Sequence, residues 1–132
     1  MKISATILAA GQSLRMENDN KLLLPIEGVP IIQHVCKTVL TANFNPVIVI
    51  TGYENENVSQ AIPKEVDNIV YNPDWDSGMA SSIYKGISSL PENVDGNMIV
   101  LGDMPMISTD TLQLLIDQFI KQKGRLIIYP IY

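Results

Sequence analysis

The chain has 132 residues, 46% of them hydrophobic, which suits a single domain over residues 1–132 with a substantial core. Its net charge of −5 and its nine singly scattered basic residues argue against a protein that binds nucleic-acid phosphates. The sequence has no signal-peptide pattern and no apolar run near the roughly 18 residues that a membrane span requires, so we expect a soluble, cytoplasmic protein without a membrane partner.

Strand-like runs alternate with amphipathic segments along the whole chain. In chain order, the periodicity predicts a strand over residues 3–9, a helix over 30–42, a strand over 46–51, a short helix over 54–62, a strand over 67–71, a helix over 77–90, a strand over 97–101, a helix over 109–123 and a last strand over 126–129. Such alternation predicts an α/β fold, a doubly wound and mostly parallel sheet between helices in three layers. Ligands of these sheets bind beyond the carboxyl ends of the strands.

The loop after the first predicted strand has an unusual composition. It reads LAAGQSLRM over residues 8–16, and Lys21 follows shortly after. Small residues such as Ala10 and Gly11 let backbone N–H groups approach a triphosphate, while Arg15 and Lys21 could neutralise its β- and γ-phosphates. Both cations could equally be solvated surface residues, and the spacing alone leaves the two interpretations open.

A second segment of interest lies where the helix over residues 77–90 begins. The N–H groups after Gly78 could face an anionic or polar ligand, whereas Ser77 or Asp76 could be a plain N-cap. Trp75, the only tryptophan, could pack against a ligand or simply seal the edge of the core.

Asp103 follows the strand over residues 97–101, which we expect to be central in the sheet, with only Gly102 between them. A carboxylate at that place suits Mg²⁺, which takes one or two carboxylates and completes its shell with water and substrate phosphates. The alternative is a turn residue before Pro105, because aspartate and proline both favour turns.

These segments together resemble a known family. The pattern L-A-A-G-x-S-x-R-M, followed by NKLLLP, is similar to the signature loop of the molybdenum cofactor cytidylyltransferases and their MobA-like NTP transferase relatives. The stretches NPDWDSGMASS (72–82) and GDMP (102–105) follow in that family's order, so the resemblance covers nearly the whole chain.

The resemblance implies a Rossmann-like nucleotidyltransferase fold and a reaction. A nucleoside monophosphate would pass from a nucleoside triphosphate to a phosphorylated acceptor, a molybdopterin, with Mg²⁺ as cofactor and release of pyrophosphate. CTP is favoured over GTP because Ala10 stands where the guanylyltransferase relatives typically carry glycine. A sugar or polyol phosphate is the alternative acceptor.

The resemblance also implies which residues form the site. Nucleotide binding falls to two groups, the first loop and the start of the third predicted helix: Leu8, Ala9, Ala10, Gly11, Ser13, Arg15, Lys21, Gly78 and Ser82. The catalytic residues would be Arg15, Lys21 and Asp103, with Asp103 as the metal ligand.

The chain departs from the family pattern in two ways. Glu17 stands where a glycine commonly follows the R-M pair, and its charge would weaken triphosphate binding. Family members also continue past the last predicted strand to a second metal-binding carboxylate, so we expect the chain to lack the C-terminal part of the family domain. Both features favour an alternative, a non-catalytic nucleotide-binding or interaction module, and an exposed last strand would allow a homo-oligomer.

The lone histidine and the lone cysteine are expected to be structural. His34 has no metal-binding neighbours at suitable spacing. Cys36 lies with Val35 and Val39 on an apolar helix face, which predicts a buried thiol without a nucleophilic role.

Overall fold

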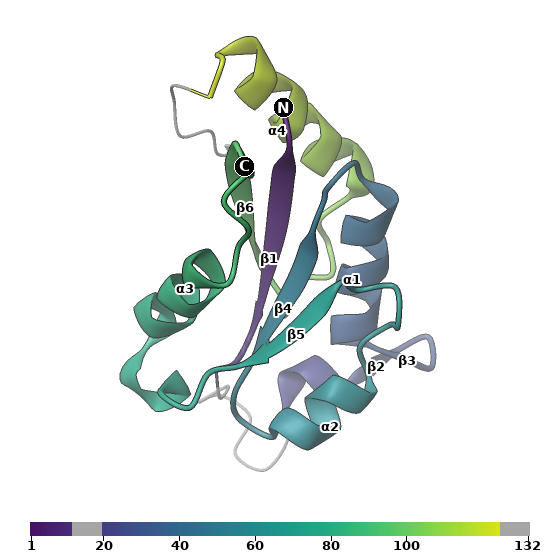
Figure 1. Ribbon diagram of the computed structural model, residues 1–132. Coiled ribbons are helices and arrows are strands. Elements are labelled where there is room, and N and C mark those ends of the chain that lie inside the picture. Colours follow the sequence, from purple (N-terminus) through teal and green to yellow (C-terminus); the bar gives the residue numbers. More distant parts are fainter. Residues whose placement is uncertain (12–19, 125–132) are drawn as a thin grey trace.

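The computed structural model describes residues 1–11 and 20–124 (Figure 1). The predicted strand over residues 126–129 lies outside these ranges. The elements are β1 (Ile3–Ala9), the short 3-10 helix η1 (Lys21–Leu23), β2 (Pro25–Ile26), β3 (Val29–Pro30), α1 (Ile31–Thr41), β4 (Val47–Thr51), α2 (Asn55–Gln60), β5 (Asn68–Tyr71), the 3-10 helix η2 (Trp75–Ser77), α3 (Met79–Ser88), β6 (Gly96–Leu101) and α4 (Thr109–Lys121). The helices in the described part of the chain include none with the length and hydrophobicity of a transmembrane span.

The sheet is parallel, as predicted, and its strands lie in the order β5-β4-β1-β6. Ala5 of β1 is in register with Val47 of β4 on one side and with Met98 of β6 on the other. The chain runs outward from β1 to β4 and β5, then returns to the far side of β1 for β6. The strand order therefore reverses at β1, and doubly wound sheets form a ligand crevice at the carboxyl ends of the strands beside such a reversal.

The position of β6 differs from the expectation of a central strand. Within the described residues β6 pairs with β1 alone and is an outer strand of the sheet. Successive residues of β6 point to opposite faces of the sheet, so Val100 is buried on one face while Ile99 on the other remains 37% exposed.

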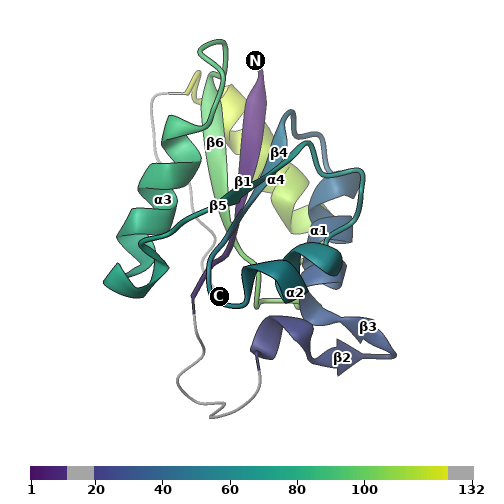
Figure 2. The same ribbon diagram turned by 60° about the horizontal axis from the view of Figure 1, so that its bottom comes forward.

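Helices cover both faces of the sheet, which confirms the three layers. Figures 1 and 2 show α3 on one face and α1, α2 and α4 on the other. Side chains of β1 alternate between these layers because successive strand residues point to opposite faces. Ile7 belongs to the core under α1 and α4, whereas Leu8 belongs to the core under α3.

A small antiparallel hairpin, β2–β3, was not predicted from the sequence. Ile26 pairs with Val29 across a turn in which Glu27 and Gly28 both have positive φ, 53° and 78°. Two positive φ values match the twist of a tight hairpin, and a glycine accepts one of them without strain. Nε2 of His34 donates to the carbonyl of Ile26 at 2.8 Å, so the lone histidine fastens this hairpin to α1 and is structural, as predicted.

Helix boundaries follow local hydrogen bonding. Ser108 caps α4, since its Oγ accepts from the Thr111 N–H at 3.1 Å. The helix predicted over residues 30–42 would include Pro30 in its first turn. In the structure Pro30 instead ends β3 and immediately precedes α1, with an extended ψ of 143°.

Cys36 is fully buried in α1, and burial raises the pKa of its thiol from 9.0 to about 12, which confirms an inert core residue.

Candidate nucleotide pocket

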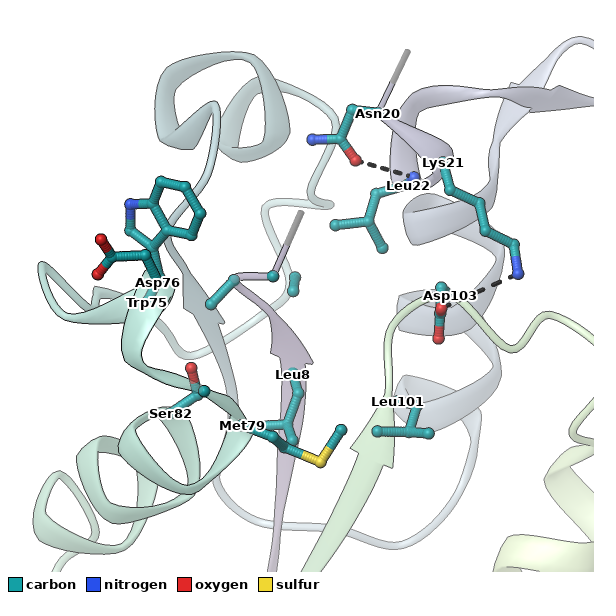
Figure 3. Close-up of a pocket in the computed structure, with 14 residues that line it drawn as sticks. Leu8, Asn20, Lys21, Leu22, Trp75, Asp76, Met79, Ser82, Leu101 and Asp103 are labelled. Carbon is teal, nitrogen blue, oxygen red and sulfur yellow. Dashed lines mark hydrogen bonds and ion pairs between the residues drawn. The ribbon is translucent and has the colours of Figure 1, made fainter. Parts of the chain in front are cut away.

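A pocket of about 550 Å³ opens at the carboxyl ends of β1 and β6 (Figure 3). It lies at the topological switch point of the sheet, between η1 on one side and the η2–α3 segment on the other. Its walls are formed by Leu8, Ala9, Ala10, Gly11, Asn20, Lys21, Leu22, Trp75, Asp76, Gly78, Met79, Ser82, Leu101 and Asp103.

Small residues bring backbone segments close together at the rear of the pocket. The Gly102 N–H donates to the Leu8 carbonyl at 2.9 Å, and the Tyr53 N–H donates to the Ala10 carbonyl at 2.8 Å. A Cβ on Gly52 would lie 2.7 Å from the Ala10 carbonyl oxygen, and one on Gly102 would lie 2.7 Å from that of Leu8. Both positions therefore require glycine for the loops to meet above the end of β1.

Lys21 and Asp103 face each other across one end of the pocket. Their Nζ and Oδ2 atoms are 3.9 Å apart, and their side chains are 45% and 46% exposed. This is a loose, solvated ion pair, so both groups can exchange their partner for a ligand at little cost. A cation and a carboxylate at one end of a pocket suit a phosphate group and its counter-ion.

Asp103 is a suitable but solitary metal ligand. Within residues 1–11 and 20–124, no three His, Cys, Asp or Glu side chains gather closely enough to hold a metal ion by themselves. Mg²⁺ commonly uses one or two carboxylates together with substrate phosphates, so a single half-exposed carboxylate fits an ion that arrives with a nucleotide.

The wall opposite η1 is held by a buried asparagine. Asn72 is 2% exposed, and its Nδ2 donates to the hydroxyls of Ser81 at 2.9 Å and Ser82 at 3.0 Å. Its Oδ1 accepts from the Asp74 N–H at 3.0 Å, which ties the loop before η2 to the first turn of α3. Ser82 is thus oriented from behind while it lines the pocket.

The start of α3 corrects one expectation. Neither Ser77 nor Asp76 caps the helix: the N-cap is Gly78, with φ 120° and no side-chain capping bond. Ser77 instead donates its hydroxyl to the Asp74 carbonyl at 2.7 Å. The N-terminal turn of α3 therefore meets the pocket through a glycine rather than through a capping side chain.

Trp75 both lines the pocket and packs on a neighbour. Its ring lies 5.4 Å from that of Tyr53, inclined at 54°, an arrangement favourable for aromatic pairs. Trp75 therefore packs at the edge of the smaller core, and its contact with a ligand stays a prediction.

Asn20 is a pocket residue that the sequence did not indicate. It is 6% exposed, and its Oδ1 accepts from the Leu22 N–H at 3.0 Å, which starts η1. This bond directs the next residue, Lys21, toward Asp103. An asparagine before the K-L-L run was the available signal for this turn.

The structure brings the predicted residues together where it describes them. Those around the pocket are Leu8, Ala9, Ala10, Gly11, Lys21, Gly78, Ser82 and Asp103. Ser13, Arg15 and the divergent Glu17 lie outside the described residues. The chemical roles of all these residues remain predictions.

Comparison with known proteins finds a family whose sequence pattern this chain matches. The MobA-like NTP transferase domain matches residues 5–132. The bifunctional protein GlmU of Geobacillus is 30% identical over 126 residues, which cover 95% of this chain and 27% of GlmU. The chain thus spans about a quarter of the length of this relative.

Solved structures share the fold. A nucleotidyl transferase from Methanothermobacter thermautotroptrophicus is 30% identical with a TM-score of 0.77, covering 88% of this chain and 57% of that one. Two more distant structures support the fold alone. They are the CMP:2-keto-3-deoxy-manno-octonic acid synthetase complexed with CTP (23% identity, TM-score 0.79, 94% and 49% covered) and a manganese complex of a Mycobacterium tuberculosis protein (20% identity, TM-score 0.72, 96% and 77% covered).

Proposed function

Because the chain belongs to the MobA-like NTP transferase family, we propose that it binds a nucleoside triphosphate and transfers the nucleoside monophosphate to a phosphorylated acceptor. One observation carries this proposal. Three segments that match the family pattern, the loop that follows Leu8, residues 72–82 and residues 102–105, lie far apart in sequence yet meet around one pocket at the switch point of the sheet. The similar nucleotidyl transferase structure supports the same activity.

The proposed reaction is a direct displacement. A phosphate oxygen of the acceptor attacks the α-phosphorus in line; the new O–P bond forms as the bond to the bridging oxygen breaks, and pyrophosphate leaves. Lys21, together with Arg15, binds the β- and γ-phosphates and neutralises the charge that develops on the leaving group. Gly11 lines the pocket after β1, and the lack of a side chain there would allow the nucleotide to lie close to the backbone.

The proposed cofactor is Mg²⁺, held by Asp103. When bound with the nucleotide, a divalent ion supplies charge neutralisation at the phosphates. The manganese complex of the similar mycobacterial protein favours a divalent metal of this kind. Lys21 is released from Asp103 in this arrangement and becomes available to phosphate oxygens, since their contact is loose.

CTP is the proposed nucleotide and a molybdopterin the proposed acceptor. The CTP complex of the synthetase with the same fold supports the nucleotide, and the L-A-A-G-x-S-x-R-M pattern supports the acceptor. A sugar or polyol phosphate is the second candidate acceptor. The same synthetase favours it, because that protein is a synthetase for CMP and a sugar acid.

Calorimetric titration with CTP, GTP, ATP and UTP, each with and without Mg²⁺, tests the nucleotide site. We expect CTP to bind best and only with Mg²⁺, and we expect Lys21→Ala and Asp103→Ala to weaken binding by about tenfold or more. Lys64→Ala and Asp110→Ala are matched controls, because both residues are exposed and outside the pocket. A folded protein that binds none of the four nucleotides would exclude the proposal.

Pyrophosphate release tests the reaction itself. CTP and Mg²⁺ are mixed with molybdopterin, with a sugar phosphate or with a polyol phosphate, and pyrophosphate is measured by a coupled assay. The acceptor that stimulates release identifies the reaction. Tight CTP binding without release from any acceptor would instead favour the non-catalytic nucleotide-binding module.

A further inference from the structure

Asn20 carries a buried side-chain hydrogen-bond donor that no residue in the described part of the chain accepts. Among the residues that the structure describes, its Nδ2 is a buried side-chain polar atom without a hydrogen-bond partner. The side chain is 6% exposed, so the surrounding solvent offers little compensation. Buried donors are almost always paired, and a persistent exception at a pocket points to a missing ligand.

The orientation of this amide follows from its other half. Oδ1 accepts from the Leu22 N–H at 3.0 Å, and a flipped amide would set two donors against each other. The NH₂ group is therefore held in one direction before any ligand arrives. A donor that is already oriented loses little conformational entropy on binding.

A second asparagine provides the contrast. Asn72 makes the same local bond, Oδ1 to an N–H two residues later, at 3.0 Å. Its Nδ2 is nevertheless satisfied by the hydroxyls of Ser81 and Ser82. Asn20 lines the pocket, whereas Asn72 lies behind Ser82 on the opposite wall. Of these two amides, only that of Asn20 has a donor without a partner among the described residues.

Figure 3 shows where that donor points. Lys21 extends toward Asp103, while the neighbouring Asn20 amide extends the other way, toward the side of the pocket that Trp75 lines. Asn20 and Lys21 therefore point toward two different parts of the same pocket. A nucleoside triphosphate is long enough and rich enough in oxygen acceptors to meet both.

We infer that Asn20 is a nucleotide-contacting residue whose side-chain amide donates a hydrogen bond to an oxygen of the bound nucleoside triphosphate. This inference rests on the proposed function and adds a residue to it. The accepting oxygen belongs either to a phosphate or to the nucleoside, and the shared chemistry is a neutral amide donor held rigid by the turn that also presents Lys21.

The Asn20→Ser variant removes the amide donor while keeping an acceptor for the bond that starts η1. A serine hydroxyl can still accept from the Leu22 N–H as a short cap but has no amide to offer the pocket. We expect the thermal unfolding midpoint of the ligand-free variant to stay close to that of wild type, and CTP affinity with Mg²⁺ to fall about 3- to 30-fold. Asn43→Ser, at an exposed position after α1, is the matched control.

Titration with inorganic tripolyphosphate distinguishes the two sources of the acceptor. Weaker binding of both CTP and tripolyphosphate by Asn20→Ser assigns the acceptor to a phosphate; weaker binding of CTP alone assigns it to the nucleoside. Unchanged binding of CTP overturns the inference while the proposed function stands. Failure of the wild type to bind any nucleotide overturns the proposed function instead.

Asn20→Asp covers the case in which the serine variant does not fold. It keeps the Oδ1 acceptor and the shape of the side chain, and it replaces the donor with an oxygen. We expect a larger loss of CTP affinity than for serine, since two oxygens would then face each other. Wild-type affinity in a folded Asn20→Asp protein would contradict a donor role.

Discussion

The two faces of the sheet are built differently. Under α1 and α4, β1 presents apolar side chains such as Ile3 and Ile7, which join a large continuous core. Under α3, the same strand presents the hydroxyls of Ser4 and Thr6, which donate to Asn97 Oδ1 at 2.8 and 2.9 Å. One strand thus supplies a hydrophobic face and a largely hydrogen-bonded face.

The difference separates stability from binding. The core under α1 and α4 holds most of the buried aliphatic surface, and the pocket opens at the end of the sheet where the smaller core gives way to small and polar residues. Apolar burial dominates folding free energy. We therefore expect substitutions in the large core to reduce stability and substitutions in the pocket to reduce binding alone.

The largest effect is expected for Ile32→Ala. Ile32 is fully buried in α1, and truncation leaves a cavity, which costs about 2–5 kcal/mol of unfolding free energy. Urea denaturation of the variant measures this loss. Ile87→Ala on α3 is the control, because that side chain is 56% exposed; an equal loss there would contradict the comparison of the two faces.

A smaller effect is expected where α3 meets the polar face. A Cβ on Gly86 would lie 2.6 Å from Cγ2 of Thr6, so Gly86→Ala should cost about 1–3 kcal/mol by overpacking. Thr6→Ser removes that methyl group while keeping a hydroxyl for Asn97. The double variant should regain part of the loss in urea denaturation, and simple additivity of the two single losses would show that the contact is not the cause.

Alkali should destabilise the large core through Cys36. The pKa of its thiol is about 12 when folded, above the ordinary 9.0, so the folded state keeps a proton that the unfolded state loses. The protonated thiol therefore contributes its full share of the unfolding free energy below pH 9. As the pH rises from 9 toward 12, the unfolding free energy falls by about 1.4 kcal/mol per pH unit. Unfolding free energies at pH 9 and 10 test this. Cys36→Ala should lack this part of the slope; an unchanged slope would contradict it.

The smallest effect on stability is expected for the ion pair in the pocket. Both side chains are nearly half exposed, so Lys21→Ala and Asp103→Ala should each change the unfolding free energy by less than about 1 kcal/mol. Urea denaturation of the same preparations used for nucleotide titration checks this. A large loss of stability would mean that their weaker binding reflects unfolding rather than lost contacts.

The sequence predicted the parallel sheet mainly from β1 and β4, whose residues are buried on both faces. Runs such as Val47–Thr51 are apolar and β-branched throughout, a pattern that few other structures share. The hairpin Pro25–Pro30 escaped prediction because two-residue strands are too short to show a period. Its turn, with a glutamate at positive φ, also lacks the usual Asn-Gly or Asp-Gly signal.

The site was predictable as a set of motifs but not as a set of contacts. Motif order indicated that Gly11, Lys21 and Asp103 belong together, and the structure places all three around one pocket. The close approach at Gly52 depends on Ala10 and Trp75, which are distant in sequence. Local composition and periodicity do not predict which side chain contacts which backbone segment.

The pairing of β1 with β6 has a consequence for how the chain reaches this structure. The Ser4 hydroxyl bonds to Asn97, 93 positions later, so the first strand cannot complete its hydrogen bonding until the segment over residues 96–101 is in place. Closing such a long loop precedes the gain from the contacts, which slows folding. Because β4 follows β1 sooner along the chain than β6 does, we expect β1 to pair with β4 first during synthesis, while the edge that later accepts β6 stays open. Assembly of the pocket is therefore a late event, because one of its walls is the end of that last-arriving strand.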